Sequence, residues 1–152
     1  MTTNVPTQSI DTLNDLVKVC EDGCAGYLKA AELTSDPILK STFARFGAER
    51  GQFANQLRTE VRRLGGEPQD SGSLAGAAHR AWFDVKTTFA SDDAKAVVNE
   101  CERGEDHAIG AYKSALEQPL APSARDIVRA QCNDVQQAHD RMHQLQVAYN
   151  KS

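Results

Sequence analysis

The stretch that decides the fold runs from Asp36 to Gly66 and reads DPILKSTFARFGAERGQFANQLRTEVRRLGG. Asp36 is a favourable helix N-cap, and Pro37 fits the first helical position because its fixed φ is already helical. Phenylalanine, leucine and valine then recur every three or four residues, which is the period of one face of an α-helix. Gly65 and Gly66 follow the last apolar residue and favour the end of the helix there. This stretch therefore predicts one long amphipathic helix.

The same period continues on both sides of this helix. Four further helices are expected, at residues 9–34, 74–89, 91–117 and 123–149. Ser9 and Ser91 are the expected caps of two of them, and Ser123 with Asp126 resembles a capping box for the last. Alternating β-branched runs, which indicate strands, are nearly absent. Two long helical hairpins joined by a crossover predict an all-α, ferritin-like antiparallel four-helix bundle, with an additional short helix in the crossover and one domain over residues 1–152.

Composition narrows the class of protein. The chain has 152 residues and a formal net charge of −4, so no electrostatic footprint for nucleic acid is expected. No stretch is long and apolar enough to span a bilayer or act as a signal core, which predicts a cytoplasmic protein. The four cysteines form no CxxC pair and are expected to be small buried side chains, although Cys20 and Cys24 lie one helical turn apart and a redox role stays open. Motifs for phosphoryl transfer and for nucleophilic hydrolysis are absent, and whether the chain is an enzyme stays open.

Polar residues interrupt the apolar faces of four predicted helices. Each lies near the middle of its helix, and mid-helix positions of an antiparallel bundle meet at one level. The residues are Glu21, Glu49, Glu102, Glu105 and His139. Carboxylates in a dry core are unfavourable unless they are protonated, paired or bound to a cation. Because carboxylates with an imidazole suit iron or manganese better than zinc, the pattern predicts an Fe or Mn site.

Several short motifs resemble a known family. They are TLNDL (12–16), EDG (21–23), AER (48–50) with QF (52–53), EVRRLGG (60–66), GSLAG (72–76), ECERGED (100–106) and AHD (138–140). From about Thr12 to Leu145 the chain is similar to the DUF2383, or PA2169-like, family of bacterial ferritin-like four-helix-bundle proteins. The resemblance implies the bundle fold and no particular activity, since the family has no characterised function.

The residues depart from the full di-iron pattern of ferritin-like carboxylate proteins. That pattern takes one Glu from each of two helices and Glu-x-x-His from each of the other two. Here Gln52 stands where the histidine after Glu49 would be, and Gln136 stands where the glutamate before His139 would be. The sequence therefore indicates an acidic layer with one histidine instead of a complete di-iron centre.

Two hypotheses follow from this layer. The first is a ferritin-like protein that binds Fe or Mn and serves in iron handling or oxidative stress. The second is a non-catalytic, metal-free structural or interaction bundle, in which arginines such as Arg50 neutralise the layer; Arg45 and Arg103 are further candidates for this role. His143 follows His139 by one turn, but only one of the two is expected to face the core. An apolar strip at Trp82 and Phe83 is expected either to cover the bundle or to form a homodimer.

Overall fold

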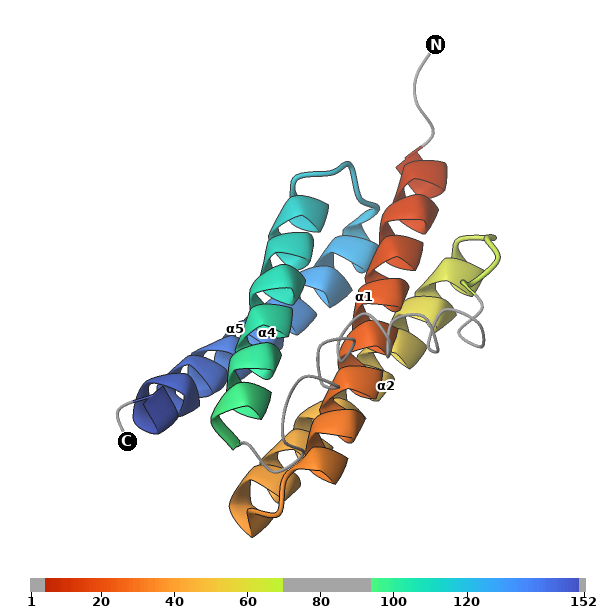
Figure 1. Cartoon of the computed structure of the whole chain (residues 1–152). Coiled ribbons are helices and arrows are strands. Elements are labelled where there is room, and N and C mark those ends of the chain that lie inside the picture. The colour runs from red at the N-terminus through yellow and green to blue at the C-terminus, as the bar shows by residue number, and fades with distance from the viewer. Residues whose placement is uncertain (1–4, 70–93, 151–152) are drawn as a thin grey trace.

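The computed structural model describes residues 5–69 and 94–150, which form four long helices (Figure 1). They are α1 (Val5–Leu33), α2 (Pro37–Arg63), α4 (Ala94–Leu116) and α5 (Pro122–Asn150). None of these helices combines the length and the apolarity needed to cross a membrane. The predicted short helix at 74–89, with Trp82 and Phe83, and the predicted cap at Ser91 lie outside the described residues.

The helices pair as two antiparallel hairpins. α1 packs along α2, α4 packs along α5, and α1 also packs against α4, whereas α2 and α5 touch only weakly. In Figure 1 α1 and α5 run in one direction while α2 and α4 run in the other. This arrangement confirms the predicted all-α, ferritin-like antiparallel four-helix bundle.

The apolar core is divided into two clusters along the bundle. One cluster contains Cys20, Phe53 and Ala108, and the other contains Tyr27, Phe46 and Cys101. On α1, α2 and α4 the boundary between the clusters falls within seven residues, which is two helical turns. The side chains that fill this boundary are polar, and they form one of the two regions described below.

The ends of α2 follow the local sequence closely. The Asp36 side chain accepts hydrogen bonds from the backbone N–H groups of Ile38 and Leu39, as an N-cap does. At the other end Gly65 has a φ of +90°, a conformation that favours glycine, and Gly66 N–H bonds to Val61 O. The predicted start and end of this helix are confirmed.

The predicted serine caps of the first and last helices are wrong. α1 already begins at Val5, and Ser9 is buried inside it, where its Oγ accepts a hydrogen bond from Ala121 N–H. α5 begins at Pro122, so that Ser123 lies within the helix and donates to Glu60 Oε2. Both hydroxyls bond across the bundle instead of capping their own helices, which local sequence does not reveal.

Candidate metal centre

The five polar residues predicted for one layer occupy four different places. Glu105 lies in the interior, Glu21 lies at the α1–α2 edge, and Glu49 lies on the side of α2 that faces α5. Glu102 and His139 lie together at the α4–α5 edge. Successive residues of a helix differ in direction by about 100°, so equal height along the bundle does not place side chains on one side.

Glu105 forms an interior triad with Arg50 and Tyr27. Glu105 is fully buried and Arg50 is only 1% exposed. Arg50 Nη2 donates to Glu105 Oε1 at 2.5 Å and to Oε2 at 2.7 Å, and the Tyr27 hydroxyl donates to Oε2 as well. Burial works to lower the pKa of Arg50, but the charge and hydrogen bonds of Glu105, together with Tyr27, outweigh it and raise this pKa. The interior carboxylate is therefore paired with a permanently charged guanidinium.

Glu21 and Glu49 are separated from the triad. Glu21 forms an ion pair with Arg58 of α2, and both side chains are mostly buried. Burial and the nearby carboxylate of Asp134 raise the pKa of Glu49. Glu21 thus has its own counter-ion, while Glu49 faces a second acid across the weak α2–α5 contact.

Glu102, Asp106 and His139 form a second region, the edge cluster. One ligand atom from each residue lies within 4.8 Å of the other two. Among residues 5–69 and 94–150, this is the group of acidic, histidine and cysteine side chains that could hold a metal ion. Ligand atoms bound at about 2.0–2.2 Å from one ion lie about 3–4 Å apart, so small side-chain rotations would close the cluster around a cation.

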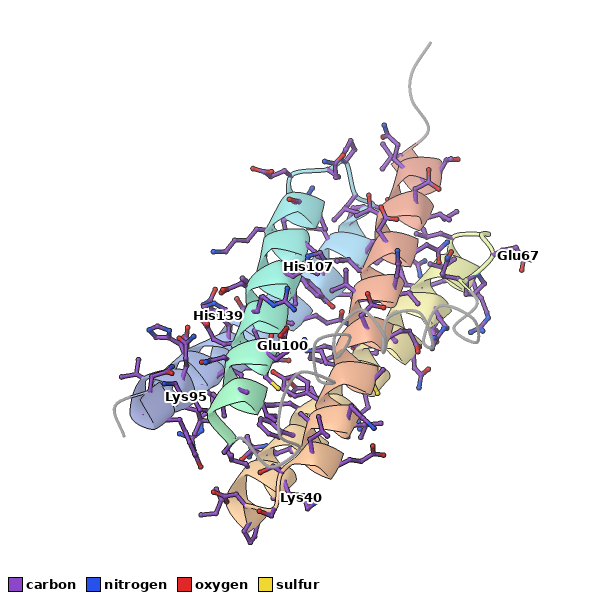
Figure 2. All side chains as sticks on the ribbon, viewed as in Figure 1. Lys40, Glu67, Lys95, Glu100, His107 and His139 are labelled. Atoms are coloured by element: carbon purple, nitrogen blue, oxygen red, sulfur yellow. The ribbon has the colours of Figure 1, made fainter. Side chains whose placement is uncertain are left out.

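His139 is held by carboxylates on two sides. Its Nε2 lies 2.6 Å from Asp106 Oδ1, and its Nδ1 lies 3.5 Å from Asp140 Oδ1. Burial works to lower the pKa of His139, but the hydrogen bonds and charges of Asp106 and Asp140 outweigh it and raise this pKa. The imidazole side chain remains 21% exposed, so the edge cluster can exchange ions with solvent. In Figure 2, His139 lies on the side of α4 that faces away from α1, and His107 lies on the side toward α1.

His143 extends the edge cluster by one helical turn. Its Nδ1 lies 3.6 Å from Glu102 Oε1, and its side chain is largely exposed. Glu102 and Asp106 are four residues apart on α4, as are His139 and His143 on α5. Because the two helices are antiparallel, Asp106 meets His139 and Glu102 meets His143. Asp106 was not among the residues predicted for the site, although it lies one helical turn after Glu102 and therefore on the same face of α4.

A second network of polar side chains in the core links Cys20, Tyr112 and Gln131. Cys20 Sγ lies 3.0 Å from the Tyr112 hydroxyl, which donates to Gln131 Oε1 at 2.7 Å. Burial raises the pKa of Cys20 to about 11, so this side chain is a thiol at neutral pH. Cys20 and Cys101 are buried as expected, whereas Cys24 and Cys132 are half-buried. Both core tyrosines, Tyr27 and Tyr112, thus complete hydrogen-bond networks.

Comparisons with known proteins agree with the architecture. A family model described as a domain of unknown function (DUF2383) matches residues 8–118. The chain superposes with a TM-score of 0.76 on a two-domain protein from Anabaena variabilis containing DJ-1/ThiJ/PfpI-like and ferritin-like domains, at 19% identity over 95% of this chain and 40% of that chain. It therefore spans about two fifths of that protein's length. A search among curated proteins gave no significant match.

Two further structures come from Mycobacterium smegmatis. A point mutant of Dps1 matches with a TM-score of 0.76 at 10% identity, over 96% of this chain and 99% of that one. Dps in a tetragonal crystal form matches with a TM-score of 0.61 at 13% identity, over 93% and 92% of the two chains. At such identities the likeness establishes the ferritin-like fold alone.

Proposed function

The chain belongs to the DUF2383 family, and we propose that it is a ferritin-like protein that binds one Fe(II) or Mn(II) ion at the edge cluster. The observation that carries this proposal is the meeting of Glu102, Asp106 and His139 from two helices within 4.8 Å. In the part of the chain that the structure describes, no arginine or lysine forms an ion pair with Glu102 or Asp106, in contrast to Glu105 and Glu21. A divalent cation would supply the missing positive charge.

The donor set favours iron or manganese. Two carboxylates and one imidazole combine hard oxygen ligands with nitrogen. Such a set suits Fe and Mn, whereas structural zinc sites are rich in sulfur ligands. His143 lies close enough to Glu102 to add a second imidazole after a side-chain rotation. Asp140, 3.5 Å from His139 Nδ1, would orient the ring from behind, as carboxylates do for metal-bound histidines.

We propose a role in iron handling or oxidative stress. The structural neighbours include a domain described as ferritin-like and two proteins named Dps. The likeness is in fold only, so the role rests on the edge cluster together with this architecture. The half-buried position of His139 would allow an ion to enter and leave.

Metal analysis tests the proposal directly. Protein purified without chelator should contain Fe or Mn, and Mn(II) titrated into metal-free protein should bind at one ion per chain. Asp106→Ala and His139→Ala should each weaken binding at least about tenfold, because removing a ligand or its partner costs 10–100-fold in affinity. Glu21→Gln is the matched control, since Glu21 was predicted for the same site but lies at the α1–α2 edge.

Two outcomes would count against the edge cluster. Wild-type protein that binds neither Fe(II) nor Mn(II), with an unchanged melting temperature in their presence, would contradict metal binding altogether. Binding that is lost in Glu21→Gln but kept in His139→Ala would show that the ion binds elsewhere in the bundle.

The alternative is a metal-free structural or interaction bundle, and the interior triad favours it. Arg50 neutralises Glu105 without any metal, as that hypothesis requires of an arginine. The other two arginines considered for this role lie elsewhere: Arg103 pairs with Glu100, and Arg45 stacks over the Phe46 ring. A wild-type chain free of metal would leave this hypothesis standing.

We also propose that the chain self-associates as a homodimer. Leu28 on α1 is 49% exposed, and Ile38 at the start of α2 is 70% exposed. Both belong to the α1–α2 hairpin, where they leave apolar surface open to a second copy. Sedimentation of wild type and of Ile38→Asp should show a dimer that weakens in the variant, and a monomer at all concentrations would contradict the dimer.

A further inference from the structure

We infer that Arg50 is a built-in cation that occupies the middle of the bundle in place of the dinuclear metal centre of ferritin-like carboxylate proteins, so that the interior takes no metal. This inference concerns the interior triad and does not depend on the edge cluster. It follows from the donors that face the interior, from their contacts and from the space around Arg50.

The inward-facing donors do not fit a dinuclear centre. Such a centre draws carboxylates and two histidines from all four helices, all projecting inward. Of the residues predicted for that layer, Glu105 alone is fully buried among the described residues. Glu21, Glu49 and His139 each point to an edge of the bundle, and the amides Gln52 and Gln136 replace the remaining two ligands. One inward carboxylate cannot hold two ions.

That carboxylate is already hydrogen-bonded at both of its oxygens. Both oxygens of Glu105 accept hydrogen bonds from Arg50 Nη2, and Oε2 also accepts the Tyr27 hydroxyl. A metal ion would have to displace the guanidinium to reach these lone pairs. The guanidinium carbon of Arg50 also lies 5.7 Å from the centre of the Tyr27 ring, a cation–π distance.

Space for the guanidinium is provided by α1. A Cβ atom added at Gly23 would lie 3.1 Å from Arg50 Nη1 and 3.5 Å from its Cγ. Gly23 and Tyr27 are one turn apart on the same face of α1. Gly23 leaves space for Arg50, and Tyr27 donates a hydrogen bond to Glu105. Together with Glu105 they enclose the Arg50 side chain between three helices.

The position along the bundle matches this role. On α2, Arg50 lies between Phe46 and Phe53, and on α4, Glu105 lies between Cys101 and Ala108. These flanking residues belong to the two separate apolar clusters, so the triad fills the boundary between them. A guanidinium stays charged at every physiological pH. The charge of the interior is therefore balanced regardless of metal supply.

Two sets of variants test the inference with Mn(II) as the probe. In Asp106→Ala/His139→Ala, which leaves the interior unchanged, no bound Mn(II) should remain in equilibrium dialysis. When Arg50→Ala is added to this double variant, Glu105 loses its counter-ion and becomes available, so Mn(II) should raise the melting temperature by about 5 °C or more. Adding Glu105→Gln to that triple variant should remove the rise, and Arg58→Ala in the same double-variant background, which frees Glu21 at the edge, should show no rise that depends on Glu105.

The outcomes separate this inference from the proposed function. Mn(II) that stays bound in Asp106→Ala/His139→Ala and is lost on adding Glu105→Gln would overturn the inference. A folded Asp106→Ala/His139→Ala/Arg50→Ala chain whose melting temperature does not respond to Mn(II) would overturn it as well. Should this triple variant not fold by circular dichroism, the first set still decides. A wild-type chain without any bound metal would contradict the proposed function while agreeing with a metal-free interior.

Discussion

Glu105 and Asp106 are consecutive residues of α4 and belong to regions of opposite character. Glu105, in the interior triad, is fully buried and bonded by Arg50 and Tyr27. Asp106, in the edge cluster, has a 59% exposed side chain and faces the imidazole of His139 at 2.6 Å. In the interior the compensating charge is permanent, whereas at the edge it depends on a proton or on an ion from solution.

The difference teaches that an acidic residue in a bundle does not by itself indicate a metal. A carboxylate in the dry core requires a partner at all times, because an unpaired buried charge is strongly unfavourable. A carboxylate at the edge stays solvated, so it needs no permanent partner and can bind a cation reversibly. The interior triad is therefore suited to holding the fold, and the edge cluster is suited to binding.

The largest expected effect breaks the interior triad. Glu105→Ala leaves Arg50 buried without its counter-ion and should lower the free energy of unfolding by about 3–5 kcal/mol. Asp106→Ala, the neighbouring residue in the edge cluster, should change it by less than about 1 kcal/mol because the Asp106 side chain is 59% exposed. Urea denaturation followed by circular dichroism measures both.

Equal losses in the two variants would show that the edge cluster is also a structural element. The double variant Arg50→Met/Glu105→Leu adds a second check, because replacing both charges by apolar side chains of similar size is often neutral. It should recover most of the stability that Glu105→Ala loses.

The second prediction concerns pH and acts on the edge cluster alone. The carboxylates of Asp106 and Asp140 raise the pKa of His139 in the metal-free protein, with Glu102 contributing in the same direction. A metal requires the neutral imidazole, so the affinity for Mn(II) should fall by about tenfold for each pH unit below that pKa. Mn(II) titrations between pH 5 and pH 8 measure this, and a flat profile would exclude His139 as a ligand.

Stability of the metal-free protein should follow the opposite course. Since the pKa of His139 is raised on folding, its interaction with Asp106 stabilises the fold fully below the unfolded pKa of about 6.5. This contribution is lost as pH rises through the folded pKa. His139→Gln should remove this part of the pH dependence.

The smallest expected effect probes the space around Arg50. Gly→Ala inside a helix usually stabilises by about 0.5–1 kcal/mol. Gly110→Ala should show this gain, because no atom lies within 4 Å of a Cβ added there. Gly23→Ala should lose the gain or become destabilising, since its Cβ would lie 3.1 Å from Nη1 of Arg50, whose guanidinium is held by Glu105 through Nη2. Equal melting temperatures of the two variants would show that Arg50 moves aside freely.

Sequence patterns predicted the fold better than the site. The helical period and the Asp36-Pro37 and Gly65-Gly66 boundaries are local features, and the structure confirms them. The caps at Ser9 and Ser123 failed because both hydroxyls bond to distant parts of the chain, Ala121 and Glu60. The metal site at Glu102 and His139 remains a prediction. The α4–α5 register in the structure adds Asp106 to that site.

The sequence by itself determined that this chain is an antiparallel bundle with charged residues on its apolar faces, because helical periodicity depends on spacing along one chain. Tertiary structure alone decided which charges meet. It placed Arg50 of α2 on Glu105 of α4 across the interior, and it turned Glu102 and Asp106 toward His139 at the edge. Neighbouring helical residues differ in direction by about 100°, so the packing of helices determines whether a carboxylate meets a guanidinium or an imidazole.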